Sequence, residues 1–546
     1  MSFIKTTTML VDASAPMNSG SFAKPAINLE LNVRSSQLLI PVLLIIGVFY
    51  LLTIRQGHQW GDDFSMYIQH AQNIAEGASY HSTSYIYLPP YVGPASYPPI
   101  CPLVLAPVVW LFGLNLTAMK AELILVFLLG LFVLAKIAKE FLPANWQLAL
   151  IALVGLNPYF WETKDLVESE PVFYLMVYLS VFVVLNSYNA IQAGASRLTQ
   201  LGYALATGLS FYLAYGTRSI GIVLVPSLVF FDLIRNRKLS LPSLYAVGSV
   251  LLAIGLIVLQ AVLLRSDRTY VESVNTGSES FLRDWMQFAL NNVPLYTASL
   301  TQIWDNGYSK LARLALTMVM SGLAVVGFVA QLRKRITFIE VFVALYTVCV
   351  VIAPMDGGIR YLLPVVPFFI FYALQGIRLL MEQQFFKAVA FRGGRTVALG
   401  GLAAAITLTY VLGYTVYNFR EIPNGISGKD AVEFFDYVNR QTAQTDVLIF
   451  GKPRALGLFT GRRGSFYPVT KDDQVIWNYF RKINATHIVS GPLGIEPTED
   501  EFLTGFLNRN RSHLREEFSK TTLKVYRIVD IPGAELSKQP GELSKQ

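Results

Sequence analysis

Two adjacent carboxylates follow the first apolar segment and begin an amphipathic pattern. After Asp62 and Asp63, apolar residues at positions 64, 67, 68, 71, 74 and 75 follow the i, i+3, i+4, i+7 spacing of a helix, which we expect to end at Gly77. An aspartate at a helix N-terminus is explained by capping, since its side chain accepts hydrogen bonds from free backbone N–H groups. Capping needs one carboxylate, and it accounts better for Asp63 than for Asp62.

A second acidic group lies between two later apolar segments. The stretch 157–171 contains four carboxylates, those of Glu162, Asp165, Glu168 and Glu170. A solvated hairpin explains part of this charge, and the proline that follows Glu170 is ordinary in the first turn of a helix. Glu170, however, begins an apolar segment, where a carboxylate costs more free energy than in a free loop. We therefore treat Asp165, Glu168 and Glu170 as candidate site residues.

Two arginines fall at the boundaries of apolar segments. Arg218 lies between two segments with almost no loop, where a cation at the C-terminal end of a helix is favourable and can extend towards water. Arg360 instead begins a segment, at the end of a helix whose dipole disfavours a cation. An anionic partner would resolve this, either a carboxylate of the protein or a phosphate of a ligand.

The composition places these residues in a membrane protein. Of the 546 residues, 53% are hydrophobic and 15% are charged, and the mean hydropathy is +0.45. Soluble domains contain about a quarter charged residues. The apolar residues fall in blocks of about 17 to 25, the length that a helix needs to cross a bilayer, and they predict about eleven transmembrane helices. The predicted spans are 38–54, 119–138, 145–158, 171–190, 200–217, 219–234, 243–264, 311–331, 337–354, 361–380 and 397–417.

The basic residues indicate how these helices are oriented. If the N-terminus is cytoplasmic, the inner loops and the N-terminal tail are rich in lysine and arginine, and the short outer loops hold far fewer, mainly Arg55, Lys164 and Arg360. This follows the positive-inside rule, so the formal charge of +8 reflects topology and not nucleic-acid binding. The segment 101–114 is short and interrupted by Pro102 and Pro107, so we expect a half-inserted or interfacial helix there.

The pattern predicts an α-helical polytopic membrane protein with a small C-terminal α/β extracytoplasmic domain. In that domain, helical patterns alternate with strand-like segments at 447–450 and 487–490. The acidic groups and both arginines then share the outer face. The predicted parts are a flexible cytoplasmic tail (1–37), a transmembrane domain (38–417) with outer loops 55–118, 158–170 and 265–310, the α/β domain (418–530) and a disordered tail (531–546).

Several motifs resemble those of the GT-C membrane glycosyltransferases in their residue types, in their order along the chain and in their predicted position on one face of the membrane. These motifs are Trp60-Gly-Asp-Asp-Phe with His70, Tyr97-Pro-Pro, Asn157-Pro158 with Ser169-Glu170-Pro171, Thr217-Arg218-Ser, and Arg360-Tyr361-Leu-Leu-Pro364. The chain is similar over nearly its whole length to the dolichyl-phosphate-mannose protein mannosyltransferases and to the lipid A aminoarabinose transferases. The resemblance implies a GT-C-like fold.

The resemblance also implies an activity, the transfer of a sugar from a polyprenyl-phosphate-linked donor to a lipid, glycan or protein acceptor, with inversion. An aspartate of the first outer loop would take the proton of the acceptor hydroxyl, and Asp62 is favoured over Asp63 for this role. Arg218, Arg360 and Tyr361 would bind the donor phosphate, whose charge grows in the transition state.

The resemblance implies that Glu170, with Asp165 or Glu168, positions the acceptor or a divalent metal ion. The sequence itself identifies no cofactor. Residues 78–118 depart from the family pattern because they contain no lysine or arginine, so a phosphate contact expected in the later part of the first outer loop has no residue to make it.

Other functions of a membrane protein are also considered, namely a transporter or flippase of lipid-linked sugars and an oligosaccharide ligase or polymerase. The sequence shows no repeated halves, and its acids cluster on one face and not in mid-span, which disfavours transport. We expect an integral protein of a bacterial plasma membrane, with a cytoplasmic N-terminus, whose partners are the lipid-linked donor and membrane lipids.

Overall fold

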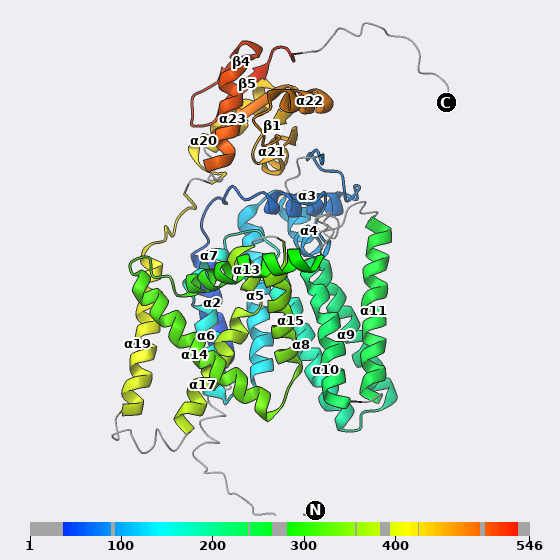
Figure 1. Cartoon of the computed structure of the whole chain (residues 1–546), viewed down its shortest axis with the longest axis vertical. Coiled ribbons are helices and arrows are strands. Elements are labelled where there is room, and N and C mark those ends of the chain that lie inside the picture. Colours follow the sequence, from blue (N-terminus) through cyan, green and yellow to red (C-terminus); the bar gives the residue numbers. More distant parts are fainter. Residues whose placement is uncertain are drawn as a thin grey trace, which may run out of the picture.

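The chain folds into a helical bundle with a small α/β domain at one end, as a computed structural model shows (Figure 1). The structure describes residues 37–88, 93–237, 241–264, 281–354, 357–382, 394–423, 425–491 and 497–532. The two predicted tails and the first part of the predicted outer loop 265–310 lie largely outside the described residues.

A helix lies at each predicted span. The bundle helices are α2 (Leu39–Leu52), α5 (Leu116–Ala138), α6 (Ala144–Gly155), α8 (Glu170–Gln192), α9 (Arg197–Thr217), α10 (Leu224–Asn236) after the 3-10 turn η1 (Ser219–Val223), α11 (Leu241–Leu264), α14 (Lys310–Lys334), α15 (Phe338–Ile352), α17 (Val366–Glu382) and α19 (Gly394–Thr415). Within the described ranges, 6 helical segments are long and apolar enough to cross a membrane, namely α5, α8, η1 with α10, α11, α14 and α19. The total number of spans stays a prediction.

The bundle has a packed interior and an apolar outer surface. Of the 18 most apolar consecutive residues of α8, 61% are buried, whereas the buried share of the corresponding residues in α11 is 11%. The exposed side chains of α11 include Leu251, Leu259 and Val262. Soluble proteins rarely expose a row of large apolar side chains along a whole helix. The exposed face of α11 therefore suits contact with lipid. The protein is an integral membrane protein.

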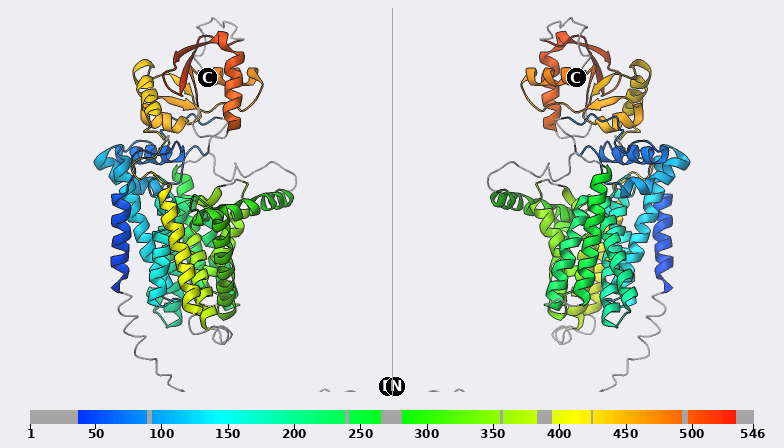
Figure 2. Two further views of the ribbon diagram at one scale, coloured as in Figure 1. Left: turned by 90° about the vertical axis from the view of Figure 1, so that its left-hand side faces the viewer. Right: turned by 90° about the vertical axis from the view of Figure 1, so that its right-hand side faces the viewer.

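Three helices lie across the end of the bundle nearest the α/β domain (Figure 2). They are α3 (Asp63–Glu76), α4 (Ile100–Phe112) and α13 (Phe281–Leu300). The predicted amphipathic helix is confirmed as α3, which ends at Gly77 in the left-handed conformation (φ 68°). The predicted short helix at 101–114 is α4, where Trp110 and Leu111 are exposed, as expected of a helix at a membrane surface. Shorter helical turns complete this end of the bundle, namely α7 (Pro158–Thr163), η2 (Thr301–Trp304) and α16 (Gly358–Leu362).

The C-terminal domain is a five-stranded sheet with helices, in the strand order β2-β1-β3-β5-β4. Strands β2, β1 and β3 are parallel, whereas β5 pairs antiparallel with both β3 and β4. The predicted strand-like segments are β1 and β3. The elements are α20 (Lys429–Gln441), β1 (Val447–Ile449), α21 (Pro453–Thr460), β2 (Arg463–Ser465), α22 (Asp473–Ile483), β3 (His487–Ser490), α23 (Pro497–Arg509), η3 (Arg511–His513), β4 (Leu514–Phe518) and β5 (Lys524–Ile528).

The C-terminal domain and the first outer loop, residues 55–118, share one hydrophobic core. Phe64 and Ile68 of α3 belong to the same buried cluster as Phe434 of α20 and Phe450 after β1. Burying large apolar side chains from both parts favours their association, by roughly 1.5–3 kcal/mol for each fully buried side chain. The domain is therefore docked on α3, next to the predicted site residues.

Candidate functional site

Arg360 joins the predicted acids into one cluster. It lies in α16, and its Nε and Nη2 donate hydrogen bonds to Glu170 Oε1 (2.7 Å) and Glu168 Oε2 (2.6 Å). Its Nη1 lies 3.7 Å from Oδ2 of Asp63. The predicted anionic partner of Arg360 is therefore present as carboxylates of the protein. The side chain of Arg360 is 36% exposed, which leaves part of the guanidinium open to a ligand.

Arg218 and Arg360 both bind the carboxylate of Glu170. Nη1 of Arg218 donates to Glu170 Oε1 (2.9 Å) and to the hydroxyl of Ser169 (3.1 Å), and its guanidinium lies over the ring of Tyr361 (5.1 Å). Glu170 thus bridges two arginines at the start of α8. The resulting carboxylate–arginine cluster consists of Asp63, Glu168, Glu170, Arg218 and Arg360.

Glu168 is a buried acid of this cluster, and its burial changes how readily it is protonated. Its side chain is 9% exposed. Burial raises the pKa of Glu168, and the charge of Arg360 opposes this effect only in part. A buried carboxyl beside an arginine and a second carboxylate can change its protonation state when a further anion enters.

Asp63 is the carboxylate of the first outer loop that stays accessible. Its side chain is 36% exposed. Its Oδ1 accepts a hydrogen bond from the hydroxyl of Tyr97 (2.6 Å) and lies 3.6 Å from Nη1 of Arg454. Its Oδ2 faces Arg360. One oxygen is therefore held by protein donors, and the other faces the cluster.

Asp62 is buried and caps a helix of the other domain. Its Oδ1 accepts the backbone N–H groups of Arg454 and Ala455 (both 3.2 Å), which belong to the first turn of α21. Burial raises the pKa of Asp62 to about 6, against the opposing charges of Arg454 and Lys452. Asp63 was expected to cap α3, but no side-chain hydrogen bond caps that helix. The aspartate that acts as a cap is Asp62, and the helix that it caps is α21.

Asp165 binds Arg55 and Lys164 and not Arg360, and its bonds to Arg55 hold the start of the first outer loop. Its Oδ2 binds Nε of Arg55 (2.7 Å) and Nζ of Lys164 (2.6 Å), and its Oδ1 accepts the N–H of Arg55 (2.9 Å). Its side chain has 0% exposure. The role predicted for Asp165 in positioning an acceptor or a metal ion stays a prediction, and its visible contacts are those of an internal ion pair.

Two histidines tie the loops of this face together as neutral rings. His58 Nε2 accepts the N–H of Val167 (2.9 Å), which joins the first outer loop to the acidic stretch 157–171. His70 Nε2 accepts the N–H of Tyr97 (3.3 Å). Burial lowers the pKa of His58 to about 3 and that of His70 to about 4, so both rings stay neutral at neutral pH. Sequence spacing gave no role for either ring.

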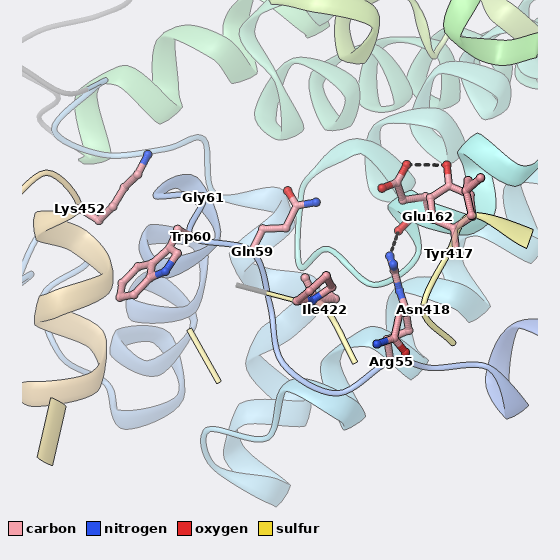
Figure 3. A pocket seen from close by; sticks show the side chains of 11 residues that line it. Arg55, Gln59, Trp60, Gly61, Glu162, Tyr417, Asn418, Ile422 and Lys452 are labelled. Atoms are coloured by element: carbon pink, nitrogen blue, oxygen red, sulfur yellow. Dashed lines mark hydrogen bonds between the residues drawn. The ribbon is translucent and has the colours of Figure 1, made fainter. Parts of the chain in front are cut away.

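Two cavities share Gln59 and Glu162 in their walls, and one of them is lined by residues of the cluster. The Arg360 cavity has a volume of about 320 Å³ and includes Glu168, Glu170 and Arg360 in its lining. The Trp60 cavity has a volume of about 410 Å³ and lies between the first outer loop, the chain that follows α19 and the C-terminal domain (Figure 3). Its side chains include Trp60, Gln59, Glu162, Tyr417, Asn418 and Lys452. Aromatic, amide and charged groups of this kind suit a polar, ring-shaped ligand.

Among the residues that the structure describes, no group of three or more His, Cys, Asp or Glu side chains is placed to hold a metal ion. The carboxylates of the cluster bind arginines instead. A divalent metal ion stays a prediction from the sequence resemblance.

The fold is that of the GT-C membrane glycosyltransferases, as the sequence motifs predicted. The archaeal oligosaccharyltransferase AglB from Archaeoglobus fulgidus, solved with an inhibitory peptide and a dolichol-phosphate, matches at TM-score 0.58 and 13% identity, over 91% of this chain and 75% of its own. ArnT from Cupriavidus metallidurans, bound to undecaprenyl phosphate, matches at TM-score 0.53 and 14% identity, over 90% and 97%. The mycobacterial arabinofuranosyltransferase AftD matches at TM-score 0.51 and 11% identity, over 89% of this chain and 41% of its own. No model of a known protein family and no curated protein matches the sequence.

Proposed function

We propose that this protein is a glycosyltransferase that moves a sugar from a polyprenyl-phosphate donor to a hydroxyl-bearing acceptor. The observation that carries the proposal is the partly exposed carboxylate of Asp63, whose Oδ2 lies 3.7 Å from Arg360, a residue in the lining of the Arg360 cavity. A base beside a cation is what a displacement at a sugar phosphate needs. The base activates the attacking hydroxyl, and the cation stabilises the departing phosphate.

In this reaction Asp63 is the general base. Its Oδ2 takes the proton of the acceptor hydroxyl while the hydroxyl oxygen forms a bond to the anomeric carbon. The bond from that carbon to the phosphate oxygen breaks, its electron pair leaves with the phosphate, and the configuration inverts. Asp62 suits this role less well, because its side chain is only 5% exposed and its Oδ1 already accepts two backbone hydrogen bonds.

Arg360 and Arg218 stabilise the phosphate. Arg360 is partly exposed at the cavity, while Glu168 and Glu170 hold its Nη2 and Nε and so fix the direction in which Nη1 points. Arg218 adds positive charge behind Glu170 and lies over Tyr361. Fixed donors of this kind stabilise negative charge that develops in the transition state without having to reorganise.

The place of the site also supports a lipid-linked donor. The cluster lies where bundle helices meet α3 and α4, so a polyprenyl tail can stay in lipid while its phosphate reaches Arg360. The dolichol-phosphate and undecaprenyl phosphate in the AglB and ArnT structures are ligands of the same chemical class. By the positive-inside pattern, this face is the extracytoplasmic side of a plasma membrane, for which we propose a bacterial source.

The test is sugar transfer by the purified protein in nanodiscs. The donors are radiolabelled polyprenyl-phosphate sugars, and a lipid and glycan extract supplies the acceptor. We expect the wild type to transfer label, Asp63→Asn to lose at least about a hundredfold in rate, as for loss of a general base, and Asp62→Asn to lose much less. Full activity of Asp63→Asn would show that another group is the base. Movement of the lipid-linked sugar across the bilayer of sealed liposomes that contain the protein, without transfer, would instead support a flippase.

A further inference from the structure

The C-terminal domain is joined to the first outer loop by backbone hydrogen bonds as well as by the shared core. Gly464 of β2 accepts the N–H of Ile86 (2.9 Å), and its own N–H donates to the carbonyl of Ser84 (3.0 Å), so residues 84–86 extend the edge of the sheet. The side chain of Gln69 in α3 donates to the carbonyl of Arg454 (3.1 Å). The start of α21 is therefore fixed against α3.

Arg454, in the first turn of α21, reaches from this domain to the first outer loop and is fully buried, with 0% exposure. Its Nη1 donates to the hydroxyl of Tyr97 (3.0 Å), and its Nη2 donates to the carbonyl of Pro94 (2.8 Å). Its Nε lies 3.6 Å from Oδ2 of Asp62. Gly93, with φ 68°, leaves room for the guanidinium, because a Cβ there would come within 2.8 Å of Nη2.

The direction of the hydrogen bonds from Arg454 fixes the arrangement of the base. A guanidinium can only donate, so the hydroxyl oxygen of Tyr97 accepts from Arg454 and its proton points at Oδ1 of Asp63. The same Nη1 lies 3.6 Å from that oxygen. Oδ1 of Asp63 is thus occupied, and Oδ2 is the oxygen left facing Arg360 and the incoming hydroxyl.

A buried guanidinium is costly unless its surroundings compensate it. Here the compensation comes from both aspartates of the first outer loop and from the rings of Tyr85 (4.9 Å) and Tyr97 (5.4 Å). Within its own domain the same arginine would have none of these partners. The energetics therefore tie the burial of Arg454 to the placement of Asp63.

We propose that Arg454 is a positioning residue that orients Asp63 through Tyr97, so that the docked C-terminal domain completes the site. This inference rests on the proposed role of Asp63 as the base. It makes the domain a part of the site and not a separate attachment.

The experiment compares Tyr97→Phe and Arg454→Lys with wild type in the transfer assay. Tyr97→Phe removes one hydroxyl and leaves the packing of the domain in place. We expect kcat to fall about tenfold to a hundredfold, as for loss of an aligning hydrogen bond at a reacting group, with the KM for the donor changed less than about twofold.

Arg462→Lys is the matched control. Arg462 is also a buried arginine of the C-terminal domain, and its bonds go to residues of that domain such as Thr442, Gln444 and Thr460. This variant weakens the domain without touching the first outer loop, so we expect kcat to stay at its wild-type value in folded protein.

The outcomes separate the two proposals. If the wild type transfers no sugar from any polyprenyl-phosphate donor, the proposed function is wrong. If the wild type is active, and folded Tyr97→Phe and Arg454→Lys keep its kcat and its KM for the donor, Arg454 has no positioning role. A fall in kcat that is matched by Arg462→Lys would also overturn the inference, since it would report only the stability of the domain. Hydrogen exchange of α21, measured on each variant, shows whether the domain is still docked.

Discussion

Nη1 of Arg360 and Oδ2 of Asp63 lie 3.7 Å apart, across the gap between α16 and the start of α3. The same arginine binds Glu170, the first residue of α8, through Nε, and Glu168, just before α8, through Nη2. Its planar fork therefore fixes three separate parts of this end of the bundle relative to one another. A side chain with a single charged nitrogen cannot make these contacts together.

Replacement of Arg360 by lysine is expected to impair transfer although the charge is kept. Lysine can satisfy Glu168 or Glu170 but does not reproduce the paired geometry. Charge-assisted hydrogen bonds contribute about 1.5–3 kcal/mol each, so loss of one lowers kcat/KM for the donor about tenfold to a hundredfold. Steady-state kinetics at several donor concentrations measure this. The control is Lys310→Arg, an exchange between the same two residue types at the exposed start of α14. An equal fall in kcat/KM in that variant would contradict the prediction.

Glu168 is expected to make donor binding depend on pH. Burial raises its pKa, so the protonated acid is more populated than in a free glutamate, and protonation removes one carboxylate that competes with a phosphate for Arg360. As pH rises through this pKa, Glu168 becomes charged and the KM for the donor increases.

In Glu168→Gln the side chain is neutral at every pH, so this rise in the donor KM is expected to flatten. Donor titrations between about pH 5 and 9, a range above the usual carboxyl pKa of about 4, decide this. A wild type and a variant with the same pH dependence would show that Glu168 does not compete with the donor.

Asp62 is expected to affect stability mainly through the cap of α21. In Asp62→Ala the N–H groups of Arg454 and Ala455 lose their acceptor, which costs about 1–2 kcal/mol. Asp62→Asn keeps an oxygen at the position that accepts both bonds, so it costs less. Thermal unfolding in detergent at pH 7 measures the difference, and equal losses in the two variants would show that the cap is not what matters.

The charge of Asp62 gives a second, pH-dependent expectation. Burial raises its pKa to about 6, above the usual value of about 4, so the folded protein holds this proton more tightly than the unfolded chain. The stability that this provides is complete below about pH 4 and is lost as the pH rises through about 6. Asp62→Asn removes this contribution. Unfolding temperatures of both proteins across that range test the sign.

Asp165 is expected to be needed for folding. Asp165→Asn leaves Arg55 and Lys164 buried without a charged partner, and breaking a buried ion pair costs about 3–5 kcal/mol. Asp305→Asn is the control, because its ion pair with Arg313 is exposed and such pairs contribute little. Yield and thermal stability in detergent report the effect. A stable Asp165→Asn protein that has lost transfer would instead support the predicted role at the site.

The sequence predicted the elements whose pattern is local. Apolar blocks indicated the bundle helices, and the period of α3 and its glycine end gave that helix within a residue. In the C-terminal domain, β2 was missed because its three residues, Arg-Gly-Ser, have no apolar run, and α21 was missed because it has only 8 residues. Short elements like these are formed by their neighbours and not by their own propensity.

The site was predicted in part for the same reason. Glu170, Arg218 and Arg360 could be grouped because each sits at a predicted span boundary on one face, and Glu168 because it lies in the same acidic stretch as Glu170. Arg454 had no such signal, since its contacts with Asp62, Asp63 and Tyr97 join parts of the chain that only the folded structure brings together. The preference for Asp62 over Asp63 as the base rested on which of them caps α3, and the structure shows that neither side chain does.

The dependence of the first outer loop on α21 has a consequence for biosynthesis. Ribosomes make the loop early and α21 late, after the bundle helices have been synthesised. Until the late segment emerges, Asp62 lacks the backbone N–H groups that it caps, and residues 84–86 lack the strand edge on which they pair. A nascent chain halted between α19 and α21 would carry its membrane helices and yet present an open, unpaired loop that quality-control proteases can recognise. Catalytic competence would then be acquired only after α21 and β2 have been synthesised.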